Sequence, residues 1–141
     1  MKDPKQHSAE HILSSAFKQL FDSNIIDSRF KGNKVRCDFK INSEIPLEQI
    51  IEQAETKANE IISQNHEITF EEISVEEAKK LYAMHRLPEG IEKVRIIHIG
   101  DDSATPCRGK HAQNTSEIGK IKIRTSNLIK PDIIRLTFVI E

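Results

Sequence analysis

The sequence His7-Ser8-Ala9-Glu10-His11, near the start of the chain, has a counterpart in Cys107-Arg108-Gly109-Lys110-His111 near its end. Each motif carries two metal-binding side chains four residues apart. On a helix, residues i and i+4 lie on one face with Cβ atoms about 6 Å apart, so both can bind one metal ion. Three imidazoles and a thiolate suit tetrahedral Zn²⁺. The motifs can share a metal only if the fold brings the two ends of the chain together.

The other potential ligands are expected to be structural. The chain has six histidines and two cysteines. His66, His85 and His98 have no second metal-binding side chain at such a spacing. Cys37 alternates with apolar residues in a strand-like stretch, so we predict that it is buried as a small apolar side chain. The zinc site is therefore assigned to His7, His11, Cys107 and His111. Four bound side chains would close the site and make the metal structural, whereas an open position would make it catalytic.

The composition indicates one globular domain over residues 1–141. At 37% hydrophobic content, the sequence has enough apolar side chains for a core. No apolar run is long enough to span a membrane, and residues 1–6 do not resemble a secretion signal. We therefore expect a cytoplasmic protein with no membrane partner, in which both cysteines remain thiols.

The charge is distributed unevenly along the chain. Residues 1–78 contain nine Lys and Arg against fifteen Asp and Glu, whereas residues 79–141 contain twelve against seven. The basic half includes the second motif, and a basic surface beside a candidate site favours an anionic partner such as a nucleic acid. Alternating charges that only solvate the faces of a sheet remain the alternative.

The pattern of elements predicts an α+β fold. The sequence from Asp3 reads as a helix start, and the apolar residues that follow at spacings of three and four extend this helix to about residue 21. His7 and His11 fall opposite the apolar stripe, so we expect them to be solvated or to face a polar cleft, with Glu10 as a surface acid. A second amphipathic helix of about twenty residues begins at Pro46, and a short helix follows Ser74. Strands are expected over 25–30, 34–41, 67–73, 93–99, 120–126 and 133–140, with a loop over 101–106.

The first motif also reads as H-x-x-E-H, the signature of inverted zinc peptidases, in which Glu10 would be the general base. The second half of the chain offers no evident additional carboxylate ligand for such an enzyme. A small zinc peptidase is retained as a minor alternative.

Residues 7–13 resemble the H-T-A-x-H-L-L segment of the alanyl-tRNA synthetase editing domain. Residues 105–111 and 114–119 are similar to its C-G-G-T-H and T-G-E-I-G segments. Residues 35–39 resemble its R-x-D-F segment, and the threonyl-tRNA synthetase editing domain shares both metal motifs. The resemblance spans nearly the whole chain in the right order. It implies a fold like the threonyl/alanyl-tRNA synthetase second additional domain, with an antiparallel or mixed sheet packed with two main helices.

The resemblance also implies a function. The chain looks like a short, free-standing AlaX-type protein that acts in trans, removing serine or glycine wrongly attached to tRNA for alanine. The sequence departs from the family at Ser8, which replaces Thr, and at Arg108 and Lys110, which replace Gly and Thr.

These residues suggest distinct roles in ester hydrolysis. Zn²⁺ would anchor the substrate, polarise the ester carbonyl or place a water. Ser8 is the candidate for recognising a substrate hydroxyl, and the backbone around Gly109 for stabilising the oxyanion. Arg108, Lys110 and Lys120 are candidates for phosphate contacts. The alternative from another class is a zinc-stabilised module that binds tRNA without catalysis.

Overall fold

The computed structural model describes residues 4–42, 44–81, 92–99, 103–106 and 112–141. The helices are α1 (Pro4–Phe21), α2 (Leu47–Ser63), α3 (Val75–Leu81) and the 3₁₀ turn η1 (Thr115–Glu117). The strands are β1 (Asn24–Lys31), β2 (Lys34–Lys40), β3 (Ile68–Ser74), β4 (Lys93–Ile99), β5 (Ser103–Pro106), β6 (Ile121–Lys130) and β7 (Ile133–Ile140). None of the helices in the described residues is long and apolar enough to cross a membrane.

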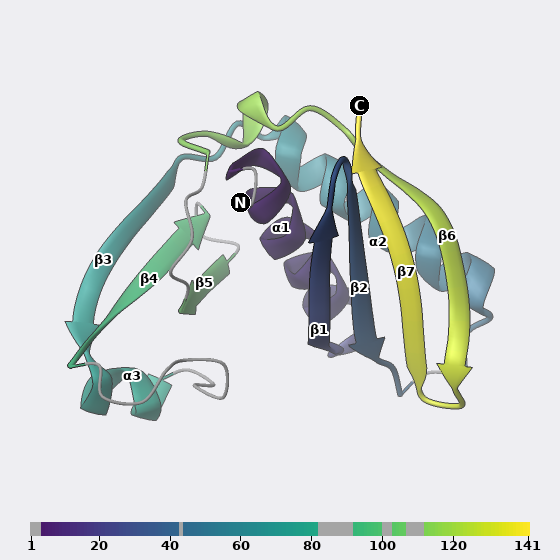
Figure 1. Ribbon diagram of the computed structural model, residues 1–141, viewed down its shortest axis with the longest axis horizontal. Helices are drawn as coiled ribbons and strands as arrows, with labels where there is room; N and C mark the ends of the chain where they lie inside the picture. The colour runs from purple at the N-terminus through teal and green to yellow at the C-terminus, as the bar shows by residue number, and fades with distance from the viewer. Residues whose placement is uncertain (1–3, 43, 82–91, 100–102, 107–111) are drawn as a thin grey trace.

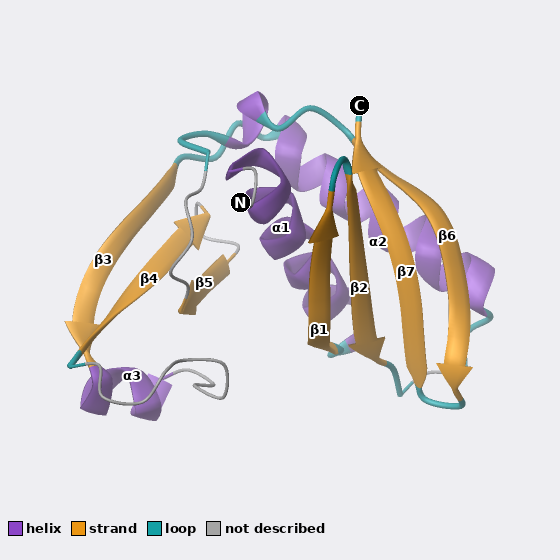
Figure 2. Ribbon diagram, in the orientation of Figure 1, coloured by secondary structure: helices purple, strands orange, loops and turns teal. Residues whose placement is uncertain are grey.

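The strands form two antiparallel sheets rather than one. The larger has the order β1-β2-β7-β6 and the smaller has the order β3-β4-β5. Helices α1 and α2 pack together and cover one face of the larger sheet, while α3 lies against the far end of the smaller one (Figures 1 and 2). This arrangement confirms the predicted α+β class with two main helices.

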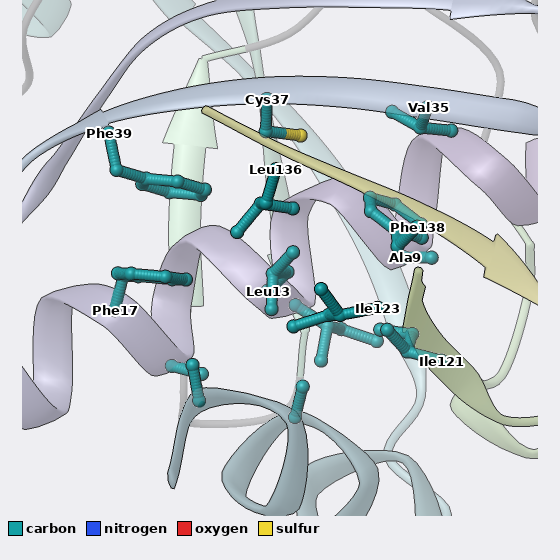
Figure 3. Close-up of a cluster of buried hydrophobic side chains, with 14 of the residues drawn as sticks. Ala9, Leu13, Phe17, Val35, Cys37, Phe39, Ile121, Ile123, Leu136 and Phe138 are labelled. Atoms are coloured by element: carbon teal, nitrogen blue, oxygen red, sulfur yellow. The ribbon is translucent and has the colours of Figure 1, made fainter. Parts of the chain in front are cut away.

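A common core joins the helices to both sheets. The ring of Phe17 in α1 stacks on that of Phe39 in β2, with centroids 3.9 Å apart. Cys37 lies beside them with no exposed surface, as predicted (Figure 3). Ile97 and Ile99 of β4 belong to the same buried cluster, so the smaller sheet shares the hydrophobic core of the larger.

The β1–β2 hairpin turns over two residues, since Lys31 pairs with Lys34. Gly32 in this turn has φ of 60°, a left-handed conformation that costs glycine little. The hairpin joins the two strands expected over 25–30 and 34–41.

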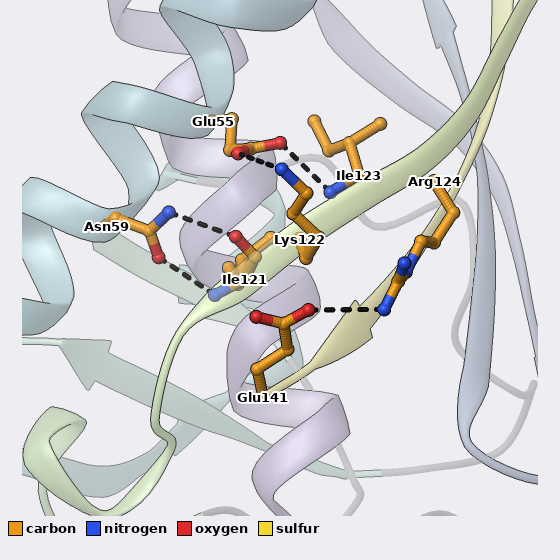
Figure 4. Close-up of polar contacts among 7 residues, drawn as sticks. All are labelled: Glu55, Asn59, Ile121, Lys122, Ile123, Arg124 and Glu141. Carbon is orange, nitrogen blue, oxygen red and sulfur yellow. Dashed lines mark hydrogen bonds and ion pairs between the residues drawn. The ribbon is translucent and has the colours of Figure 1, made fainter.

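Side chains from α2 bind the outer edge of β6. The Asn59 amide donates to the Ile121 carbonyl and accepts from its N–H, at 3.0 and 2.8 Å. A carboxylate oxygen of Glu55 accepts from the N–H of Ile123 at 3.0 Å (Figure 4). Since β6 is at the edge of its sheet, these contacts satisfy backbone groups that a neighbouring strand would otherwise bind.

Two predicted elements differ from the structure. Residues 103–106, expected to be loop, form β5, which pairs with β4 through backbone hydrogen bonds. Strand β6 continues to Lys130, beyond the predicted end at residue 126, because it remains paired with β7 where its side chains are exposed.

Candidate functional site

The first two turns of α1 hold the histidine pair. The ring centroids of His7 and His11 are 5.1 Å apart and the rings are inclined by 32°. The side chains are 3% and 7% exposed, so the first of the two expected surroundings, solvent, was wrong, and the polar cleft stays a prediction. Phe30 of β1 packs edge-on against His7, with centroids 6.0 Å apart. This contact covers a helix face that the apolar stripe of α1 alone would leave exposed.

The two imidazoles are arranged so that they could provide two of the ligands of one metal ion. Within the described residues, His7 Nδ1 and His11 Nε2 are buried and form no hydrogen bond, although both residues have other interactions. Uncharged imidazole nitrogens are common Zn²⁺ ligands. No group of three or more His, Cys, Asp or Glu side chains suited to a metal occurs in the part of the chain that the structure describes. The predicted partners Cys107 and His111 lie outside it.

Glu10 also differs from its prediction. Instead of being a surface acid, it is buried on α1. The first half of this helix is enclosed on more than its apolar side, since Gln6, His7 and Ser8 are buried as well.

The Ser8 hydroxyl links α1 to the residue that directly follows the second motif. It is fully buried, and its Oγ accepts a hydrogen bond of 2.9 Å from the N–H of Ala112. On the other side of the motif, β5 ends at Pro106 and packs against α1. The described residues that flank 107–111 on both sides therefore contact the helix that carries the histidines.

Further bonds hold the chain after Ala112 in place. Ile68 of β3 donates its N–H to the carbonyl of Gln113. Thr115, which is fully buried, donates its hydroxyl to the Ile62 carbonyl at 3.0 Å and accepts from the N–H of His66 at 2.9 Å. The segment leaving the second motif is thus attached to α1, to β3 and to the end of α2.

A capping box starts η1. The N–H of Ser116 donates to Asn114 Oδ1, and Glu117 Oε2 accepts from the N–H of Asn114, both at 2.9 Å. The sequence N-x-x-E predicts this geometry, a local signal that was missed beside the family resemblance of residues 114–119. The sequence gives no comparable signal for the hydrogen bond from Gln6 Nε2 to the Gly32 carbonyl. This bond fixes the β1–β2 hairpin to the first turn of α1.

Of the remaining predicted site residues, the structure describes Lys120. Cys107, Arg108, Gly109, Lys110 and His111 lie outside the described residues. Lys120 is exposed and lines a shallow hollow at the end of α2.

The histidines expected to be structural have partners in the structure where it describes them. His98 Nε2 lies 3.0 Å from a carboxylate oxygen of Glu71, and His66 Nε2 lies 2.7 Å from Gln64 Oε1. His85 falls outside the described residues.

An ion pair near the hairpin joins β2 to β7. Arg135 binds Asp38 through two hydrogen bonds of 2.9 and 3.0 Å. These hydrogen bonds, assisted by the charges of Arg135, Arg36 and Arg29, lower the pKa of Asp38 against the opposing effect of its burial. The carboxylate of Asp38 is therefore ionised at neutral pH and bound to Arg135.

Comparison with known proteins identifies a matching family and several similar proteins. Residues 94–137 match the family described as the threonyl and alanyl tRNA synthetase second additional domain. The chain is 32% identical over 136 residues to an alanine–tRNA ligase of Prochlorococcus marinus, covering 94% of this chain and 15% of the ligase. It is 30% identical over 140 residues to an alanine–tRNA ligase of Campylobacter jejuni, covering 97% of this chain and 16% of the ligase.

A third relative is an editing protein. The chain is 32% identical over 120 residues to the alanyl-tRNA editing protein AlaX-L of Pyrococcus horikoshii, covering 84% of this chain and 29% of that protein. The chain thus spans less than a third of the length of each of these relatives. The matches confirm the family resemblance expected from the motifs.

Proposed function

We propose, from the relationship of this chain to the editing domains of alanyl-tRNA synthetases and to an alanyl-tRNA editing protein, that it hydrolyses aminoacyl-tRNA. The substrate would be a small amino acid, serine or glycine, esterified to the 3′ end of tRNA for alanine. The reaction would release the free amino acid and intact tRNA.

One observation carries this proposal beyond the sequence relationship. The hydrogen bond from Ala112 to Ser8 holds the chain that leaves the second motif against the helix that carries the first. A site shared by the two motifs needs this meeting of the chain ends. The contact of β5 with α1 supports it from the other side.

The proposed metal is Zn²⁺, held by His7, His11, Cys107 and His111. The separation of the two described imidazoles, their burial and their nitrogen donors fit such an ion. With one of these four ligands displaced to leave an open position, Zn²⁺ would supply Lewis-acid polarisation of the ester carbonyl or of an attacking water. The backbone around Gly109 would donate to the developing oxyanion.

The protein groups would also exclude water and bind the substrate. The two histidines are buried, and Phe30 packs against His7, so water is kept from this side of the site, which strengthens polar interactions with the substrate. Arg108, Lys110 and Lys120 would contact the phosphates of the tRNA.

Deacylation by the purified protein tests the proposal. We expect about one Zn²⁺ per chain, release of serine from seryl-tRNA for alanine, and much slower release of alanine from alanyl-tRNA. Cys107→Ala and His11→Ala should each lower zinc content and hydrolysis. Cys37→Ala is the matched control, since Cys37 lies in the core, and should keep its zinc.

Two outcomes would point elsewhere. Protein with full zinc that binds tRNA but releases no amino acid would contradict hydrolysis and favour the non-catalytic binding module. Peptide cleavage abolished by Glu10→Gln, without release of amino acid from tRNA, would favour the peptidase. Freshly purified protein without zinc would contradict the metal assignment.

A further inference from the structure

An unusually basic stretch lies within the acidic half of the sequence. Residues 29–36 contain four cations, Arg29, Lys31, Lys34 and Arg36, and no acidic residue. This stretch forms the end of the β1–β2 hairpin. The phosphate contacts expected from the sequence, Arg108, Lys110 and Lys120, all lie in the second half of the chain.

The hairpin places all four cations on one face. Arg29 pairs directly with Arg36, and Lys31 pairs with Lys34. Side chains directly opposite in an antiparallel pair point to the same side of the sheet. Between these pairs, Val35 points inward and is fully buried, so the cations face away from the core. We call these four residues the hairpin cations.

This arrangement is unfavourable unless an anion binds to it. Like charges directly opposite each other destabilise a β-sheet. Among the described residues, Lys31, Lys34 and Arg36 form no ion pair, and Arg29 has one exposed contact of 3.6 Å with Asp27. The nearby carboxylate of Asp38 is bound by Arg135. The hairpin end therefore keeps a positive charge.

The hairpin that carries these cations lies beside the candidate active site, with Phe30 on its inner face and the cations on its outer face. Gln6, the residue before His7, donates to the carbonyl of Gly32 at the hairpin turn, at 2.9 Å. Phe30, between Arg29 and Lys31, packs against the ring of His7. Figure 1 shows the β1–β2 turn at the same end of the molecule as the start of α1.

We propose that the hairpin cations bind the phosphate backbone of the RNA whose 3′ end enters the site at His7 and His11. Arginine forks match phosphate geometry, and lysines add point charges. The chemistry is that of RNA backbone recognition, which is independent of base sequence. This inference rests on the proposed function, because it identifies the RNA as the substrate of that site.

A pair of charge-matched variants tests the surface. The test variant is Lys31→Gln with Lys34→Gln, and the control is Lys79→Gln with Lys80→Gln on α3, where both lysines are also exposed. Binding of tRNA for alanine that carries no amino acid is measured over a series of salt concentrations. We expect the hairpin variant to bind about tenfold more weakly, with its slope of log affinity against log salt smaller by about two. The control should match the wild type.

Thermal unfolding accompanies the binding measurement. Removing two opposed lysines should leave the melting temperature unchanged or slightly raised, so weaker binding could not be attributed to misfolding.

The outcomes separate this inference from the proposed function. If the wild type hydrolyses seryl-tRNA but the hairpin variant keeps its tRNA affinity and salt slope, the surface is wrongly assigned and the function stands. If the wild type binds tRNA through the hairpin but releases no serine, the surface stands and hydrolysis fails. Hairpin-dependent binding of poly-glutamate as tight as that of tRNA would overturn an RNA surface and favour an acidic protein partner.

Discussion

The hydroxyl of Ser8 performs a structural task that its position in the motif does not reveal. In the sequence, Ser8 stands between two predicted ligands and is a candidate for reading a substrate hydroxyl, which remains a prediction. In the structure its Oγ accepts the N–H of Ala112 in a fully buried position. Because Ala112 directly follows the second motif, Ser8 also positions this part of the chain against α1.

Replacing Ser8 by Ala should therefore destabilise the protein and weaken zinc binding. The buried N–H of Ala112 would lose its acceptor, at a cost of about 1–3 kcal/mol in the free energy of unfolding. Ser8→Thr keeps the acceptor oxygen and should retain most of the zinc affinity. Urea denaturation and zinc competition titrations measure the two effects.

Ser15→Ala is the control for this series. It removes another hydroxyl from α1, one that accepts an exposed hydrogen bond from Gln19, and should change the stability by less than about 0.5 kcal/mol. Unchanged stability and zinc affinity in Ser8→Ala would show that the bond to Ala112 does not support the site.

The histidine pair shows what sequence periodicity can and cannot predict at this scale. The spacing of His7 and His11 correctly predicted two imidazoles close together on α1. Their burial was missed, because the helical pattern reports one apolar face. The opposite face is covered by Phe30, which is distant in sequence.

At the scale of elements, α2 protects the exposed edge of β6. Asn59 satisfies both backbone groups of Ile121, and Glu55 accepts from Ile123. Unpaired edge strands are sites of association between protein molecules. The polar face of α2 therefore protects a strand edge in addition to contacting solvent.

Replacing Asn59 by Leu should lower the free energy of unfolding by about 1–3 kcal/mol, since it leaves a backbone donor and an acceptor of β6 unsatisfied. Asn59→Asp keeps the acceptor for the Ile121 N–H and should cost less. Chemical denaturation measures the stabilities, and light scattering measures association. Gln53→Ala, an exposed change on the same helix, serves as the control. Equal stability of all three variants and the wild type would contradict an edge-protecting role for Asn59.

The elements themselves were largely predictable because their patterns are local. Apolar alternation at Val35, Cys37 and Phe39 identified β2, and all three are buried. Strand β5 was missed because its four residues, Ser-Ala-Thr-Pro, are too few to show an alternation of apolar and polar residues. The division into two sheets depends on which strands pair. This pairing joins residues that are far apart in the sequence, and the local alternation of apolar residues does not predict it.

At the scale of the whole molecule, the ion pair of Asp38 and Arg135 fastens the hairpin to the last strand. Arg135 lowers the pKa of Asp38 in the folded protein, whereas the unfolded chain has the ordinary pKa of about 3.9. The unfolded state then binds more protons between the two values. The stabilisation is fully present above the unfolded pKa and is lost as the pH falls through the folded one.

Asp38→Asn should accordingly lower the free energy of unfolding at pH 7, by about 1.5–3 kcal/mol for hydrogen bonds to a charged group. The difference from the wild type should shrink as the pH is lowered below about 4. Urea denaturation at pH 7 and at several acidic values measures it. A difference that stays constant down to acidic pH would mean that the charge of Asp38 does not stabilise the fold.

The position of β7 has a consequence for the order in which the molecule is completed. This strand ends at Ile140, yet it lies between β2 and β6 and pairs with both. The β1–β2 hairpin can form from neighbouring residues, but it joins β6 in one sheet only when β7 has paired with both. Closing the larger sheet therefore depends on a pairing between residues about a hundred positions apart, which should form later than the local hairpin during folding.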